Sequence, residues 1–337
     1  MDWLAENEKY ALLGLSINLE GPTVEPRTVA PNFDLVEKSK FELPPHWREW
    51  LGTIRTEEIE ECDIFVLSKL RSKQPEALDA ENQILARNVR RFFVGLLLTS
   101  TFATTHAPVV ITGSWEDNET GIREIYELDA PIPNDFRPHP EVRAFDLEEA
   151  ARIAHQLELA NSIAEGPSHW RLFRALNLYV ETRTKRDLLN RLHQYARCIE
   201  GLLLCDPGNS RKQFKSRSEL FIGPTHHDIM GEIYEMRGQV EHLHEDLMLE
   251  PFDRTTRLNI MRNEAVIEHV ARTTLSRIVS DQGLWPHFAN RTGLTNFWTL
   301  HERERRAIWG PPIDPLTAVA DFNPKFIDDD ILGGQHQ

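Results

Sequence analysis

The segment from Ile229 to Leu247 constrains the fold of this chain more than any other part of the sequence. Apolar residues recur in it at alternating steps of four and three positions, namely at Ile229, Ile233, Met236, Val240, Leu243 and Leu247. This spacing places them on one face of an α-helix that packs against other helices. The sequence therefore predicts a helical bundle in this part of the chain.

Four helices of such a bundle are predicted in the second half of the chain. The first begins near Ser168, the second spans 185–205, the third begins near Thr225 and the fourth spans 253–280. A basic loop is expected at 208–224. Further helices are expected at about 146–164 and around the last three tryptophans, Trp285, Trp298 and Trp309.

The first half of the chain is expected to be an α+β region with a small sheet. Residues 10–19 have the composition of a strand, and a helical pattern begins at Arg55. The longest predicted helix spans 77–101. A β-hairpin is predicted from the apolar runs 109–112 and 122–128.

The formal charge of −15 is distributed unevenly along the chain, which bears on its partners. Residues 1–168 contain 16 Lys and Arg against 30 Asp and Glu, whereas residues 169–280 contain 17 against 15. This acidic balance argues against a protein that coats DNA. Only residues 169–280 would not repel a polyanion.

The composition favours a cytoplasmic protein without a membrane contact, a metal site or a cofactor. The three cysteines form no CxxC spacing, and the best apolar run, 92–101, is too short to span a bilayer. The N-terminus lacks the apolar core of a signal peptide. Neighbouring histidines such as His226 and His227 point to different faces of a helix, so they are not expected to share a metal ion.

An arginine and a histidine stand beside the apolar stripe described first, with four residues between them. Tyr234 precedes Arg237 by three positions, Glu241 follows it by four, and His242 and His244 complete the group. A guanidinium is positively charged at any ordinary pH, and an imidazole exchanges a proton near neutrality. Together they can cleave a phosphodiester without a metal ion.

The segment IYEMRGQVEH, residues 233–242, resembles the signature helix of the HEPN family, and most closely its Apea-like subgroup. In that subgroup an apolar and aromatic lead-in precedes the arginine and the histidine of the motif. The resemblance covers about 168–280, a third of the chain. It implies a HEPN-type helical bundle and a metal-independent endoribonuclease, of a kind found in toxin and antiviral defence systems.

The resemblance also implies roles for individual residues. His242 would act as general base on the ribose 2′-hydroxyl, and Arg237 would stabilise the phosphorane. The products would be a 2′,3′-cyclic phosphate and a 5′-hydroxyl. Glu200 corresponds to an acid that many family members carry near the active site. HEPN sites are usually composite, so a homodimer is implied as well.

Helical geometry leaves other interpretations of these residues open. Positions five apart lie about 140° apart around a helix, whereas Arg237 and His244 share one face with Glu241 between them. Arg237 and Glu241 can also form an exposed ion pair. Gly238 and Leu243 depart from the subgroup's pattern and favour a non-catalytic module that binds RNA, a nucleotide or a protein. A helical interaction protein without a nucleic-acid role is a third alternative.

A basic cluster before the third helix is the candidate RNA-binding surface. Arg211, Lys212, Lys215 and Arg217 supply four cations with no acid among them, and Phe214 could stack on a base. The alternative is a flexible loop whose charges are solvated.

The predicted fold class is therefore mainly α, with a C-terminal four-helix-type HEPN bundle that carries extra helices. A smaller α+β domain precedes it. The expected boundaries are 1–145 for the acidic N-terminal domain, 146–310 for the helical HEPN-like domain and 311–337 for a C-terminal tail.

Overall fold

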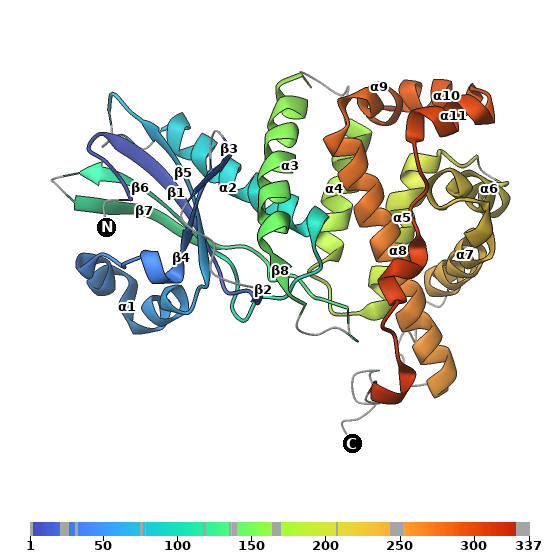
Figure 1. Ribbon diagram of the computed structural model, residues 1–337, viewed down its shortest axis with the longest axis horizontal. Coiled ribbons are helices and arrows are strands. Elements are labelled where there is room, and N and C mark those ends of the chain that lie inside the picture. Colours follow the sequence, from blue (N-terminus) through green and yellow to red (C-terminus); the bar gives the residue numbers. More distant parts are fainter. Residues whose placement is uncertain are drawn as a thin grey trace. The chain divides into compact units, whose positions relative to one another are not determined.

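The computed structural model describes residues 3–20, 27–30, 33–74, 77, 79–116, 119–134, 136, 140–163, 170–206, 208–242 and 252–327. These residues form eleven α-helices and a six-stranded antiparallel sheet, so the chain is mainly helical, as its sequence predicts (Figure 1). The chain divides into two compact units: 1–133 with 139–159, and 134–138 with 160–337. In the described ranges, no helix has the length and apolar character needed to cross a membrane.

The antiparallel sheet forms the core of the first unit, with its strands in the order β3-β4-β5-β1-β6-β7. In chain order they are Glu8–Leu15 (β1), Arg27–Ala30 (β3), Phe33–Glu37 (β4), Ile64–Arg71 (β5), Val109–Glu116 (β6) and Glu119–Glu127 (β7). In the centre, Leu12 of β1 lies opposite Leu67 of β5 and Ile111 of β6. Strands β6 and β7 confirm the predicted hairpin. A separate parallel pair joins Leu19–Glu20 (β2) to Val142–Arg143 (β8).

Helices cover both faces of this sheet. Helix α1 (Pro45–Glu60) contributes Trp47 to the apolar cluster that contains Leu12 and Leu67. Helix α2 (Ala80–Thr99) packs against β1, β5 and β6, and its Asn88 donates a hydrogen bond to Ser68 Oγ at 3.2 Å. Neighbouring residues of a strand face opposite sides, so Leu67 and Ser68 mark the two covered faces.

The prediction of a helical pattern from Arg55 onward is wrong for Ile64–Arg71, which forms strand β5. Residues Ile64 to Leu67 are all buried, because α1 and α2 cover opposite faces of the sheet. A strand that is buried on both faces is a continuous apolar run without the alternation that identifies a half-exposed strand. Periodicity alone could not distinguish this run from a segment of a buried helix.

Helix α3 (Ala144–Ile163) joins the first unit as far as Leu159, so the division lies later than the expected boundary after residue 145. The cause is a close approach of α3 to α2. A Cβ atom placed on Gly95 of α2 would lie only 2.3 Å from the carbonyl oxygen of Ala150. Small residues on both helices therefore allow the two backbones to pack together.

The second unit contains the four predicted bundle helices. They are α4 (Trp170–Thr182), α5 (Leu188–Leu203), α7 (His227–His242) and α8 (Arg254–Ser280). Asp253 caps α8 by accepting a hydrogen bond from Thr256 N at 2.8 Å, as the sequence predicts. Helices α9 (Trp285–Phe288), α10 (Arg291–Thr299) and α11 (Glu302–Trp309) include the three late tryptophans.

The predicted basic loop at 208–224 is wrong, because Ser210–Ile222 forms a helix, α6. Phe214 and Phe221 are fully buried on one side of it, and Gly223 ends it with a φ of 78°. The high density of charge suggested a solvated loop. The two phenylalanines, seven positions apart, lie on nearly the same face of a helix and were the missed signal.

Buried ion pairs join α8 to the neighbouring helices. Arg191 Nε donates to Glu264 Oε1 at 2.8 Å, and both side chains are at most 2% exposed. Arg183 lies 3.5 Å from Glu268, which also accepts a hydrogen bond from Tyr179 at 2.8 Å. Burial would raise the pKa of Glu268, but the neighbouring arginines hold it below its usual value. Buried charges of this kind require their partners, so they fix how these helices pair.

Part of the expected tail, residues 311–327, packs against the bundle. Ile313 is buried, and its N–H donates to Phe221 O at 2.7 Å. Arg254 donates to Pro324 O at 2.7 Å. The acidic residues 328–337 lie outside the described part of the chain.

The contact between α2 and α3 yields a stability prediction. Gly95→Ala should lower the free energy of unfolding by about 1–3 kcal/mol, because the new methyl group would clash with the backbone of Ala150. Urea denaturation followed by circular dichroism measures this change. Gly238→Ala on α7 is the control, since nothing lies within 4 Å of a Cβ there. That variant should gain about 0.5–1 kcal/mol, and a Gly95→Ala variant at least as stable as the wild type would contradict the close packing of α2 and α3.

Candidate functional site

Arg237 of the predicted motif makes an ion pair with Glu200, an acid that the sequence analysis also singled out. Arg237 Nη1 on α7 lies 3.0 Å from Glu200 Oε1 on α5, with the two side chains 12% and 23% exposed. The guanidinium carbon lies 5.3 Å from the centre of the Tyr234 ring, in a cation–π contact. The carboxylate and the ring thus hold the guanidinium in place at the surface of the bundle.

The partner residues of the motif are only partly described. Helix α7 extends to His242, but the side chains of Glu241 and His242 lie outside the described part of the structure. His244 lies outside it altogether. The choice between His242 and His244 as the partner of Arg237 therefore stays a prediction.

The basic cluster of α6 is largely neutralised by ion pairs within the bundle. Arg211 contacts Glu235, and Lys215 Nζ lies 3.2 Å from Asp228 Oδ1. Arg217 donates to the backbone of α5 instead of projecting into solvent. Both acids belong to α7, so these cations tie α6 to its neighbour. A surface of four unpaired cations, as the sequence suggested, is not what the helix presents.

Phe214 cannot stack on a base as the sequence analysis suggested. Its side chain is fully buried, and its ring centre lies 5.2 Å from that of Tyr234. Among the five residues of the predicted RNA-binding cluster, Arg211 and Lys212 are exposed at the surface of α6, and Arg211 is paired with Glu235. The prediction was wrong because this segment forms a helix, and Phe214 lies on its buried face.

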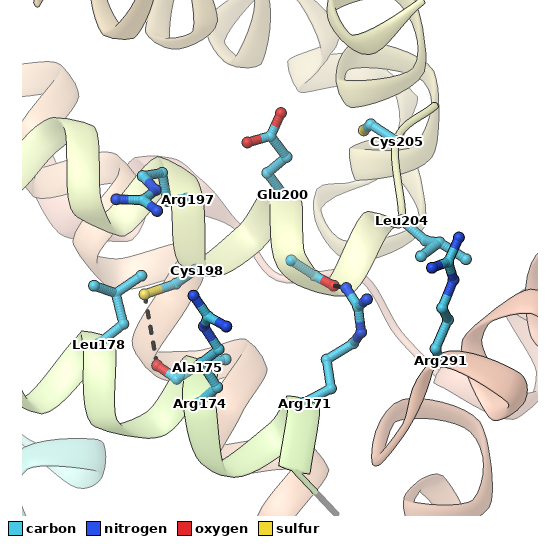
Figure 2. Close-up of a pocket in the computed structure, with 11 residues that line it drawn as sticks. Arg171, Arg174, Ala175, Leu178, Arg197, Cys198, Glu200, Leu204, Cys205 and Arg291 are labelled. Atoms are coloured by element: carbon cyan, nitrogen blue, oxygen red, sulfur yellow. Dashed lines mark hydrogen bonds between the residues drawn. The ribbon is translucent and has the colours of Figure 1, made fainter. Parts of the chain in front are cut away.

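A second cationic feature, not predicted from the sequence, is a pocket of about 480 Å³ along α4, α5 and the start of α10. Figure 2 shows Arg171 and Arg174 extending from α4 toward α5, with Arg291 at the beginning of α10. The lining residues are Arg171, Arg174, Ala175, Leu178, Arg197, Cys198, Glu200, Gly201, Leu204, Cys205 and Arg291.

The charges that line this pocket are strongly unbalanced. Four arginines face one carboxylate, Glu200, and that carboxylate already contacts Arg237. Burial lowers the pKa of Arg171, and the positive charges of Arg291 and Arg174 lower it further. Arg171 is therefore close enough to Arg291 and to Arg174 to be repelled by both, and an anion in the pocket would relieve this repulsion.

The wall of the pocket includes the carboxyl end of α5, whose last carbonyl groups have no partners within the helix. Side chains from three other helices supply donors. The pairs are Arg171 Nη1 with Gly201 O (2.9 Å), Trp298 Nε1 with Leu202 O (3.3 Å) and Arg217 Nη1 with Leu203 O (2.8 Å). Two of the arginines near this site thus donate to the end of α5, and Arg171, which lines the pocket, is one of them.

The pKa of the Cys205 thiol depends on the charged side chains around it. Burial raises the pKa of its thiol to about 11, Glu200 acts in the same direction, and Arg217 and Arg237 act against it. The thiol is therefore protonated at neutral pH and is a poor nucleophile. Its pKa nevertheless depends on the ion pair between Glu200 and Arg237.

The histidines at the start of α7 bind carboxylates of different segments. His227 contacts Glu219 of α6, whereas His226 Nε2 lies 3.8 Å from Asp314 Oδ1. In the described residues, no group of three or more His, Cys, Asp or Glu side chains is placed to hold a metal ion.

Comparisons with protein families, curated proteins and solved structures give no match to this chain.

The position of Cys205 yields a prediction about its reactivity. With a pKa of about 11, only about one thiol in a thousand is ionised at pH 8, so alkylation by iodoacetamide should be slow. Glu200→Gln removes a charge that raises the pKa and should accelerate the reaction several-fold at pH 8. Arg237→Gln should slow it. Peptide mapping by mass spectrometry measures the rate at Cys205 alone.

Glu181→Gln, on the exposed face of α4, is the matched control and should leave this rate unchanged. Equal rates for all of these variants would show that Glu200 and Arg237 do not lie beside Cys205 in solution.

Proposed function

We propose that the second unit binds RNA and that the arginine-lined pocket holds its phosphate groups. The observation that carries this proposal is the convergence of four arginines from α4, α5 and α10 on one cavity with a single carboxylate. Guanidinium groups bind phosphate oxygens through paired, charge-assisted hydrogen bonds. The resemblance of residues 233–242 to the HEPN signature makes RNA the polyanion that we propose.

The distribution of charge along the chain supports the same proposal. Residues 169–280 are nearly balanced, with 17 basic and 15 acidic side chains, while the rest of the chain is acidic. Several acids of this region are already paired: Glu264 and Glu268 inside the bundle, and Glu235 with Arg211 at its surface. The pocket is therefore a local positive field in an acidic protein, which directs a polyanion to one place.

Metal-independent cleavage of that RNA is a second candidate function, favoured by the way Arg237 is held. Glu200 lines the pocket and pairs with Arg237, so a strand bound in the pocket would pass close to this guanidinium. In this proposal His242 removes the proton of the ribose 2′-hydroxyl, and Arg237 stabilises the charge of the phosphorane. Residues 237 and 242 point to different sides of a straight helix, so two protomers would each supply part of the site.

The binding proposal predicts which arginines contribute to RNA affinity. Replacing Arg174, Arg197 and Arg291 by glutamine should weaken binding of a single-stranded RNA and reduce the slope of log K against log salt by about 2. Arg171 is left intact because it caps α5. Fluorescence anisotropy with labelled RNA at several salt concentrations measures both quantities.

Replacing Arg211, Lys212 and Lys215 removes the same number of positive charges from α6 and is the control. Its effect should be smaller, because Arg211 and Lys215 are already paired with acids of α7. A larger loss of affinity in this control than in the pocket variant would locate the RNA on α6, as the sequence first suggested, and would refute our proposal.

The cleavage proposal predicts complementation between two inactive variants. Arg237→Ala and His242→Ala should each reduce RNA cleavage by at least about 100-fold, and EDTA should have no effect on the wild type. If the active form is a homodimer with composite sites, mixing the two variants should restore part of the activity. Gel analysis of the RNA, with a test for 2′,3′-cyclic phosphate ends, measures the outcome.

His244→Ala serves as the comparison in this experiment. Loss of activity there, with His242→Ala fully active, would transfer the role of base to His244. Cleavage that stops on chelation would overturn the metal-independent mechanism. Wild-type protein that binds RNA without cutting it would leave the binding function and remove the nuclease.

A further inference from the structure

The pocket has the dimensions of a site for one small ligand. Its volume of about 480 Å³ lies in the range of cavities that enclose a cofactor or a nucleotide. Three segments border it: α4, the last turns of α5 with Leu204 and Cys205, and the start of α10 (Figure 2). A site for an internal segment of an RNA strand needs only a line of cations along a groove. Here the four arginines line a pocket instead.

The pocket also combines its charge with apolar surface. Ala175 and Leu178 of α4 and Leu204 after α5 line it together with the four arginines. Figure 2 shows Leu178 and Leu204 on the two sides of the arginine cluster, so apolar contacts flank the cations. A ligand that fits this lining has a concentrated negative charge and an apolar part beside it.

We propose that this pocket recognises a terminal phosphate monoester of a nucleotide, either at the phosphorylated end of an RNA strand or in a free mononucleotide. This inference deepens the proposed RNA binding and rests on it for the choice of the nucleotide.

Charge decides between a terminal and an internal phosphate. A phosphate monoester carries about −1.5 to −2 charges at pH 7 and three terminal oxygens, whereas the phosphodiester of a strand carries one charge and two such oxygens. Arg174, Arg197 and Arg291 line the pocket together with Arg171, and each guanidinium carries several N–H donors in a forked arrangement. The monoester uses more of these donors, and it neutralises more of the mutual repulsion of the arginines.

The environment of Arg171 supports the same ligand. Its guanidinium is held by the carbonyl oxygen of Gly201, and burial together with Arg291 and Arg174 lowers its pKa. The protein therefore keeps a cluster of like charges together before any ligand arrives. Because Arg171 is already held in place, it loses little conformational entropy on binding, which favours a compact dianion beside it.

Binding of matched ligands to the full-length protein tests this inference. Isothermal calorimetry would compare one short RNA in three forms, with a 5′-phosphate, with a 3′-phosphate and with neither, and would compare adenosine monophosphate with adenosine. We expect one phosphorylated end to raise the affinity about tenfold or more over the unphosphorylated strand. Adenosine monophosphate should bind and compete with that RNA, while adenosine should not.

Arg174→Gln and Arg291→Gln provide the matched variants. Both side chains are exposed, so the fold should persist, and each should reduce the advantage of the phosphorylated end severalfold. Arg211→Gln on α6 should leave this advantage unchanged, because its guanidinium pairs with Glu235 outside the pocket. Circular dichroism of each variant checks that the helices are intact.

The outcomes separate this inference from the proposed function. Equal affinity for the phosphorylated and unphosphorylated strands would overturn the inference and leave RNA binding standing. Binding of adenosine monophosphate without binding of any RNA would support the pocket as a nucleotide site and overturn the RNA-binding function. An advantage of the phosphorylated end that survives in both pocket variants would also overturn the inference, since another site would then recognise the phosphate.

Discussion

The second unit depends on how the carboxyl end of α5 is completed. The last carbonyl groups of a helix lack partners within it, and the negative end of the helix dipole lies there. In this protein Arg171, Trp298 and Arg217 donate to that end from α4, α10 and α6. One helix terminus therefore fixes three other helices around it. The same end forms a wall of the pocket, so the demand for donors at α5 places positive charge where a ligand can use it.

The arginines of this unit divide into groups with different roles. Arg183 and Arg191 are buried and pair with glutamates of α8, so they determine which helices adjoin. Arg217 caps α5 while its guanidinium lies over the Trp298 ring at 5.3 Å. Arg171 both completes the end of α5 and lines the pocket, which it shares with Arg174, Arg197 and Arg291. An arginine that is held by contacts within the protein cannot reorient toward a ligand. Its contacts within the fold must therefore be known before it is assigned a role in binding.

The sequence predicted the features that depend on local chemistry. Helix α8 and its cap at Asp253 were found because capping and apolar spacing involve residues a few positions apart. Strand β5 was missed because burial on both faces removes the alternation, and α6 was missed because its charges concealed the phenylalanines. Glu200 beside Arg237 was expected only from the family resemblance. The pocket could not be predicted, since Arg171 and Arg291 come from segments 120 positions apart that tertiary packing brings together.

The order of strands in the sheet has a consequence for how the first unit acquires its structure during synthesis. Strand β1 is made first and pairs with β5 and β6, and Leu12 finds its partner Ile111 about a hundred residues later. The buried Lys9 likewise meets Asp79 of the α2 cap only across 70 residues. Such non-local pairing requires closure of long loops and is slow. During synthesis one edge of β1 can pair once β5 has emerged, but its other edge stays unpaired until β6 has left the ribosome. Adjacent helices of the second unit, in contrast, can pair as soon as they appear.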